Sequence, residues 1–110
     1  MNDASYAWLI LVPRRAGLTG FHEVAESDAA ALTGEIHRAA RALQSRFAPD
    51  RINIGALGNL VPQLHIHVIA RFADDPAWPG PVWGARPPVP YEPDALQARI
   101  AELRAALAEA

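Results

Sequence analysis

The chain has 110 residues, of which 51% are hydrophobic and 20% charged, a composition typical of a folded globular domain and outside the range of disordered chains. Its 10 basic and 12 acidic residues give a net charge of −2, so it lacks the basic excess with which proteins bind long DNA or RNA. It has no cysteine, which excludes disulfides, a thiolate nucleophile and cysteine-ligated zinc. We expect a single domain over residues 1–110.

The first twelve residues predict a soluble, cytoplasmic protein that begins with a strand. They contain no positively charged segment and lead into only a short apolar run, so they resemble neither a secretory signal nor a membrane span. That run, residues 6–12 (YAWLILV), stops at Pro13 and is too short for an independent helix. We therefore predict a strand that is covered on both faces.

A long amphipathic helix is predicted next, from about Asp28 to Phe47, after a turn region at residues 13–20. Ser27 is placed to cap it, and one apolar stripe runs along it through Leu32, Ile36, Leu43 and Phe47. Two strands follow, at residues 51–57 (RINIGAL) and residues 63–72 (QLHIHVIARF).

The alternation in residues 63–72 predicts that the two faces of this strand differ. One face carries Leu64, Ile66, Val68 and Ala70. The other face carries Gln63, His65, His67, Ile69 and Arg71. We expect the first face to pack in the core and the second to carry chemistry.

The last third of the chain is predicted to be a loop followed by a helix. Seven of the ten prolines lie between residues 73 and 93, so no long helix or strand is expected there. A second amphipathic helix begins near Pro93. The order of elements favours an α+β fold: an antiparallel sheet with one long central helix and a C-terminal helix.

The polar face of residues 63–72 holds the candidate chemistry. Side chains two residues apart on a strand are separated by about 6.5–7 Å, so Gln63, His65 and His67 form a row about 13 Å long that could follow a di- or triphosphate. With an ordinary pKa of about 6.5, an imidazole near neutral pH can be a nucleophile, a base or a cationic donor to phosphate. Two imidazoles side by side can divide displacement and protonation between them.

Other interpretations of the histidine pair remain open on the residues alone. The pair can be merely a partly exposed polar face. It can also bind zinc, in which case a third protein ligand would have to be His22, His37, Asp74 or Asp75.

Several neighbouring residues receive a structural interpretation. We expect Arg71 to be a surface cation paired with Asp74 or Asp75, not a catalytic group. Trp78 and Trp83 could lie over a nucleobase, but tryptophan in a proline-rich loop more often covers core or subunit surface. We assign no role to His22 or to His37, which lies on the predicted helix.

A glycine-containing segment precedes the histidine strand. Residues 53–59 (NIGALGN) place two glycines and two short amides where backbone N–H groups could turn toward an anion. No Gly-Lys-Ser/Thr follows, so the segment is not a P-loop.

Residues 53–71 resemble the signature of the histidine-triad (HIT) family, in which a Gly-Gln-x-Val segment precedes His-x-His-x-His. With Arg71 aligned, Gln63, His65 and His67 stand at the first, second and third triad positions. Residues 3–14 and 77–84 extend the resemblance to a bacterial branch that carries Gln at the first position. The implied fold is the HIT-like antiparallel sheet.

The resemblance implies a hydrolase or nucleotidyl transferase that acts on nucleotides without a metal or cofactor. His65 would attack the α-phosphorus of a dinucleoside polyphosphate (Ap4A-like) or a nucleoside phosphoramidate and become transiently nucleotidylated, while His67 supports the attack. Asn53, Gly58, Asn59 and Gln63 would bind the nucleotide and its phosphates. Family members pair through the helix and an edge strand, so a homodimer is also implied.

Some positions depart from the family pattern. The amide of Gln63 can donate to a phosphate oxygen but cannot change protonation state. Asn59 is shorter than the usual Gln, and Ala70 stands where Pro is common. Members of the branch usually have more N-terminal residues, which contribute a strand and part of the nucleoside pocket, so the chain is expected either to be a shortened version or to be completed by a partner subunit. The alternative functions are a non-catalytic nucleotide-binding module and a zinc-binding domain that uses His65 and His67.

Overall fold

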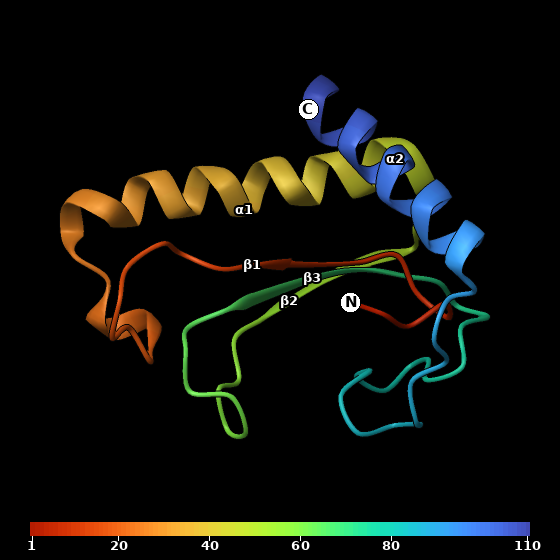
Figure 1. Ribbon diagram of the computed structural model, residues 1–110, viewed down its shortest axis with the longest axis horizontal. Helices are drawn as coiled ribbons and strands as arrows, with labels where there is room; N and C mark the ends of the chain where they lie inside the picture. Colours follow the sequence, from red (N-terminus) through yellow and green to blue (C-terminus); the bar gives the residue numbers. More distant parts are fainter.

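The computed structural model describes residues 1–110 as a small sheet covered by a long helix (Figure 1). The elements in chain order are β1 (Trp8–Leu11), the short 3₁₀ helix η1 (Phe21–Glu23), α1 (Glu26–Phe47), β2 (Arg51–Gly55), β3 (Ile66–Arg71) and α2 (Pro93–Glu109). The strand order is β1-β3-β2, and both pairings are antiparallel. The predicted α+β fold, with its long central helix and C-terminal helix, is confirmed.

β3 is the middle strand, and all six of its residues are buried. It is shorter than predicted, because Leu64 donates its backbone N–H to the carbonyl oxygen of Leu18 and so leaves the regular ladder. In the ladder, His67 lies opposite Ile10 of β1 and Gly55 of β2. The histidine strand therefore runs through the centre of the sheet.

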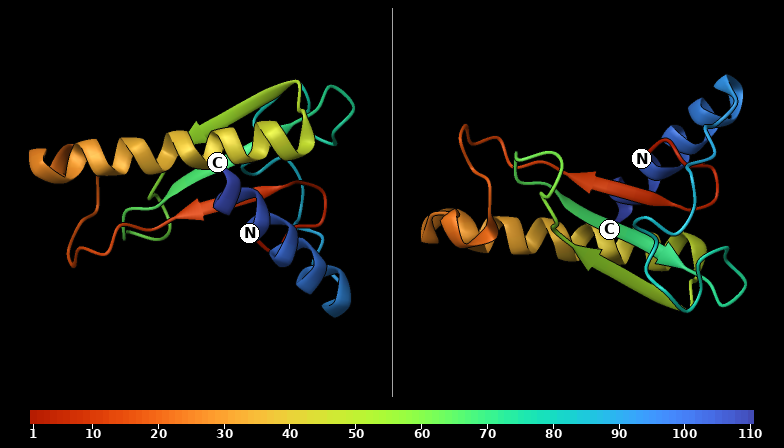
Figure 2. Two further views of the ribbon diagram at one scale, coloured as in Figure 1. Left: turned by 90° about the horizontal axis from the view of Figure 1, so that it is seen from above. Right: turned by 90° about the horizontal axis from the view of Figure 1, so that it is seen from below.

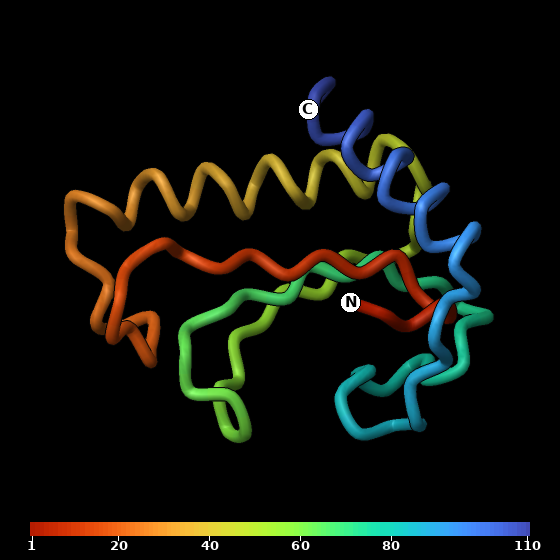
Figure 3. The backbone as a smooth tube through the Cα atoms, viewed as in Figure 1, coloured from red at the N-terminus to blue at the C-terminus, as the bar shows by residue number.

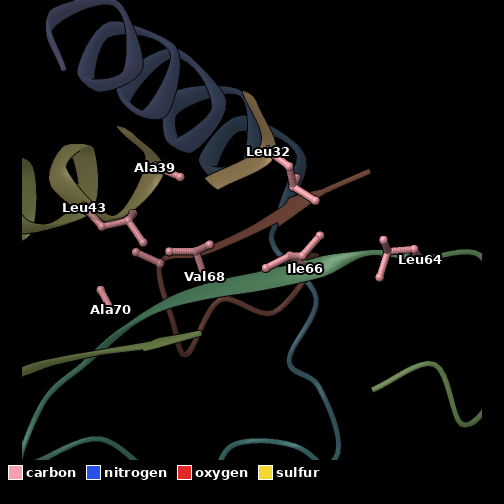
Figure 4. Close-up of a cluster of buried hydrophobic side chains, with 8 residues drawn as sticks. Leu32, Ala39, Leu43, Leu64, Ile66, Val68 and Ala70 are labelled. Atoms are coloured by element: carbon pink, nitrogen blue, oxygen red, sulfur yellow. The ribbon is translucent and has the colours of Figure 1, made fainter. Parts of the chain in front are cut away.

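The face of the sheet toward α1 forms the main hydrophobic core. Figure 4 shows side chains of α1 and of the β3 segment meeting between helix and strand. The labelled core residues are Leu32, Ala39, Leu43, Leu64, Ile66, Val68 and Ala70. The predicted apolar face of residues 63–72 is thus confirmed.

The start of α1 differs from the sequence prediction. The residue that precedes the helix is Ala25, which makes no side-chain cap, and Ser27 lies inside the first turn. Asp28, also in that turn, accepts two hydrogen bonds from the guanidinium of Arg15, and its negative charge suits the N-terminal end of the helix dipole. Ala48, in the left-handed conformation with φ 47°, ends the helix just before Pro49.

The opposite face of the sheet is covered by irregular segments. Seen from below, the proline-rich segment between β3 and α2 lies across one end of the strands (Figure 2). The backbone tube shows this segment and the β2–β3 connection on the side of the sheet away from α1 (Figure 3). A second apolar cluster closes this side and contains Tyr6, Trp8, Ile69 and Val82, with Ala77 and Trp83 packed against it.

Arg71 ties the proline-rich segment to the sheet. Its guanidinium donates to both carboxylate oxygens of Asp75 at 2.7 and 3.1 Å, to Oδ1 of Asn53 at 2.7 Å, and to the carbonyl oxygen of Gly80 at 2.7 Å. The prediction of a pair with Asp75 is confirmed, but the prediction that Arg71 lies at the surface is wrong, because its side chain is only 2% exposed. The segment folds back over the guanidinium and removes it from water.

Asp75 keeps its charge in this buried network. Burial alone would raise the pKa of the carboxyl group, but hydrogen bonds from Arg71 and from the backbone N–H groups of Phe72 and Trp78 lower that pKa to about 2.

None of the helices has the length and apolar character needed to span a membrane.

Candidate active site

His67 is held among aromatic rings on the face of the sheet away from α1. It is buried, and Nε1 of Trp8 lies 2.9 Å from its Nδ1. Because the indole N–H can only donate, Nδ1 of His67 must accept, and the neutral ring then carries its proton on Nε2. Burial lowers the pKa of His67 below its ordinary value, and the charges of His65 and of the N-terminal ammonium group lower it further.

His65 carries its proton on the other ring nitrogen. Its Nδ1 lies 2.7 Å from the main-chain carbonyl oxygen of Gln63. A carbonyl oxygen can only accept, so Nδ1 is the protonated nitrogen and Nε2 of the neutral ring keeps its lone pair. The rings of His65 and His67 meet edge to face, with centroids 4.9 Å apart.

Both histidines line one cavity of about 560 Å³. The β2–β3 connection forms part of its wall through residues 57–61, and Trp8, Ile10, Val82 and Trp83 add apolar and aromatic surface. A cavity of this size, with a few polar groups in an apolar wall, is typical of small-molecule sites, which measure about 300–1,000 Å³.

The cavity brings together four of the six residues predicted for the site. Gly58 and Asn59 line it with His65 and His67. Gly58 has a φ of 75°, which glycine adopts without strain and which turns the chain beneath the histidines.

The other two predicted residues have their side chains elsewhere. Oδ1 of Asn53 accepts a hydrogen bond from Arg71, and Nε2 of Gln63 donates to the carbonyl oxygen of Arg15 at 3.4 Å. Neither residue lines the cavity. Gln63 acts on the site through its backbone, because its carbonyl oxygen orients His65.

The sequence interpretation missed the role of Trp8 and left that of Trp83 open. Their rings lie 5.5 and 5.4 Å from the ring of His67, both edge to face. Trp83 packs above Gly55, where an added Cβ would lie 3.0 Å from Cη2 of the indole. A signal for this arrangement was available in the sequence, since Gly55 is a glycine inside a strand, which often marks close approach of another group.

The charges around the cavity are few. Arg86 contributes the one guanidinium among the lining residues, and Asp3 contributes the one carboxylate. Nowhere in the structure do three or more histidine or carboxylate side chains come together to hold a metal ion. Zinc bound by His65 and His67 would therefore have no third protein ligand.

Comparisons with known proteins identify the family of this chain and agree with its fold. A family model described as the HIT domain matches residues 1–74. A histidine triad protein of Bradyrhizobium japonicum has 46% sequence identity and a TM-score of 0.92, and the match covers 97% of this chain and 80% of that one. A histidine triad (HIT) protein of Sinorhizobium meliloti 1021 has 44% identity and a TM-score of 0.92, with 96% and 78% covered.

A third solved structure, a histidine triad protein of Marinobacter aquaeolei VT8, has 42% identity and a TM-score of 0.94, with 99% of this chain and 80% of that one covered. No curated protein matches the chain. The resemblance inferred from residues 53–71 is thereby confirmed at the level of the family. The chain belongs to the HIT domain family, a family of nucleotide-binding hydrolases and transferases.

Proposed function

We propose that this protein is a nucleotide hydrolase or nucleotidyl transferase in which His65 is the nucleophile and His67 assists it. The observation that carries the proposal is the hydrogen bond between Nδ1 of His65 and the carbonyl oxygen of Gln63. It leaves the lone pair on Nε2 of a histidine that lines the cavity. It also supports the positive charge that the ring gains when Nε2 forms a bond to phosphorus.

The proposed reaction is a double displacement. Nε2 of His65 bonds to the α-phosphorus while the bond from phosphorus to the leaving oxygen or nitrogen breaks, and the leaving group keeps that electron pair and takes up a proton from solvent. Water then attacks the same phosphorus, the P–N bond breaks, and a nucleoside monophosphate leaves with His65 restored.

The developing charge on the non-bridging oxygens requires hydrogen-bond donors. Three kinds are available along the cavity: Nε2–H of His67, the side-chain amide of Asn59 and backbone N–H groups near Gly58. We assign phosphate binding to these groups. Asn53 and Gln63, whose side chains point to other partners, contribute by holding Arg71 and His65 in place.

The proposed substrates are dinucleoside polyphosphates and nucleoside phosphoramidates. The apolar wall of the cavity suits a base and ribose, and the row of polar groups beside it suits one phosphate. Arg86 is exposed and can meet a further phosphate of a polyphosphate leaving group. A nucleoside phosphoramidate has no further phosphate for Arg86 to bind. Substrates of both classes are therefore included in the test.

Trapping the covalent intermediate tests the proposal. The protein is mixed with diadenosine tetraphosphate or with adenosine 5′-phosphoramidate, quenched in alkali because P–N bonds to histidine are acid-labile, and analysed by peptide mass spectrometry. We expect an adenylyl group on the peptide that contains His65. His65→Ala should lower turnover by about 10³-fold or more, whereas His37→Ala, a matched change on the exposed side of α1, should leave turnover unchanged.

The test separates the enzyme from the second candidate, a non-catalytic nucleotide-binding module. Binding of adenosine monophosphate without any adduct or turnover would favour the module. An adduct on another residue, or full activity of His65→Ala, would contradict the assignment of the nucleophile.

Four further proposals concern the chain as a whole. We propose that residues 1–110 form one HIT-like domain of the bacterial branch with Gln at the first triad position, and that the protein is a cytoplasmic homodimer. β1 and β2 are the edge strands of the sheet, and an edge strand can pair with a second copy. Sedimentation analysis of the purified protein measures the oligomeric state.

A further inference from the structure

We propose that Trp8 is a positioning residue that holds His67 in the Nε2–H tautomer, so that His67 serves as a hydrogen-bond donor to phosphate and not as the acid that protonates the leaving group. The catalytic part of this inference rests on the proposed function. The placement of the proton does not, and it can be measured without any substrate.

The contact between the two side chains is short, buried and directional. The distance from Nε1 of Trp8 to Nδ1 of His67 is 2.9 Å, and both residues are less than 10% exposed. The sheet enforces this proximity, because Trp8 pairs with Ile69 on the neighbouring strand, two residues from His67 and on the same face. Solvent does not compete for a hydrogen bond in this position.

The chemistry of the indole makes the tautomer a consequence of this contact. Indole N–H is a donor only, whereas imidazole Nδ1 can donate or accept. If Nδ1 of His67 carried a proton, two N–H groups would face each other at 2.9 Å in a buried site, and both would be unsatisfied. The proton is therefore confined to Nε2.

Ring packing prevents His67 from turning away from Trp8. Its ring is surrounded edge to face by Trp8, Trp83 and His65, with centroid distances of 5.5, 5.4 and 4.9 Å. Trp83 is itself seated closely over Gly55. A flip of the imidazole would require these rings to move together.

The charged and titratable groups near His67 mostly oppose its protonation as well. From its own segment the neighbour is His65, and from the N-terminal segment it is the ammonium group of Met1, both of which lower the pKa of His67. Asp3 and Arg86, one charge of each sign, line the same cavity. Burial and the hydrogen bond from Trp8 lower the pKa of His67 as well, as do His65 and the N-terminal ammonium group.

The two histidines thus present complementary ring nitrogens to one cavity. His65 is protonated on Nδ1 and offers the Nε2 lone pair, while His67 offers Nε2–H. This differs from the expectation that the pair would divide displacement and protonation between them. In the arrangement inferred here, the leaving group takes its proton from water.

Long-range ¹H–¹⁵N correlation spectra of histidine-labelled protein test the placement of the proton. We expect His67 to show only the Nε2–H tautomer, with a pKa below the ordinary histidine value of about 6.5. In Trp8→Phe we expect both tautomers and a raised pKa, because the neutral form loses its hydrogen bond. A mixture of tautomers or the Nδ1–H form in the unaltered protein would overturn the proposal, even if Trp8→Phe did not fold.

The pH dependence of kcat/KM tests the catalytic part. In Trp8→Phe the neutral ring divides between two tautomers, of which only one carries Nε2–H. We therefore expect kcat/KM to fall at alkaline pH, by about twofold if both tautomers are equally populated, and to fall less at lower pH, where protonated His67 carries Nε2–H in any case. Trp78→Phe, a matched change in an indole that lies outside the cavity, should keep the original profile. An equal loss at every pH, with unchanged spectra, would show that Trp8 acts by packing alone.

A protein with the expected tautomer but no turnover would contradict the proposed function and leave the role of Trp8 in place. A protein with turnover but with the Nδ1–H tautomer of His67 would contradict the role of Trp8 and leave the proposed function in place. The two failures are therefore distinguishable.

Discussion

The face of the sheet that packs on α1 is closed by alternating apolar side chains, whereas the opposite face is closed by aromatic and charged groups from segments far apart in the chain. On the α1 face, nearly any volume-conserving apolar replacement should keep the layers together. On the opposite face, the buried polar groups of Arg71, Asp75 and His67 require particular partners. The α1 face is therefore stabilised by filled apolar volume, whereas the opposite face depends on specific polar partners, which also fix the geometry of the site.

The largest effect on stability is expected from breaking the ion pair between Arg71 and Asp75. This pair lies on the face of the sheet opposite α1, which we call the site face. Arg71→Leu leaves the carboxylate of Asp75 buried without its main partner and should lower the free energy of unfolding by about 3–5 kcal/mol. Urea denaturation measures this loss. Adding Asp75→Asn, which keeps an acceptor but removes the charge, should recover part of it; no recovery would show that the charge is not the cause.

The α1 face should respond nearly as strongly to loss of volume. Leu43 is fully buried in the core, and Leu43→Ala should lower the free energy of unfolding by about 2–5 kcal/mol through lost burial and a cavity. Leu60→Ala is the matched control, because Leu60 is 95% exposed and its truncation should change stability by less than about 0.5 kcal/mol. Similar losses in both variants would contradict the division between core and surface.

Acid should reduce the stability that the site face contributes, because that face contains a buried carboxylate and the apolar α1 face does not. The pKa of Asp75 is lowered to about 2 in the folded protein, so the stabilisation from its charge is complete above the ordinary carboxyl pKa and is lost as the pH falls toward 2. The loss from this group should amount to about 2 kcal/mol between roughly pH 5 and pH 2. Urea midpoints measured across this range should fall less steeply for Asp75→Asn than for the unaltered protein.

The smallest effect on stability is expected at the contact between Gly55 and Trp83. Gly55→Ala gains about 0.5–1 kcal/mol from the stiffer backbone, but the new Cβ must displace the indole, so the net change should stay below about 1 kcal/mol. KM for a nucleotide substrate should nevertheless rise by a factor of about two to five. Gly34→Ala on α1, where an added Cβ meets nothing, should stabilise by about 1 kcal/mol and leave KM unchanged.

Local periodicity was sufficient to predict most of the fold. The alternation in residues 63–72 predicted which side chains of β3 face α1, because a strand has only two faces and one of them must be apolar. The first residue of each long helix was predicted to within two residues, and α2 begins at Pro93 as expected. The cap at Ser27 was wrong because the helix begins two residues earlier than a side-chain cap there would require.

The residues that line the cavity could be predicted only where they are close in sequence. His65, His67, Gly58 and Asn59 lie within one short stretch, and all four line the cavity. The hydrogen bond from Trp8 spans 59 residues and has no local signal. The burial of Arg71 likewise depends on Asn53 and Gly80, which approach it only after the chain has folded.

The orientation of His65 comes from a backbone atom, the carbonyl oxygen of Gln63. Every amino acid carries that oxygen, so the anchor of the imidazole survives whichever side chain occupies position 63. A substitution at position 63 that keeps the backbone in place should therefore leave the ring of His65 in the same orientation.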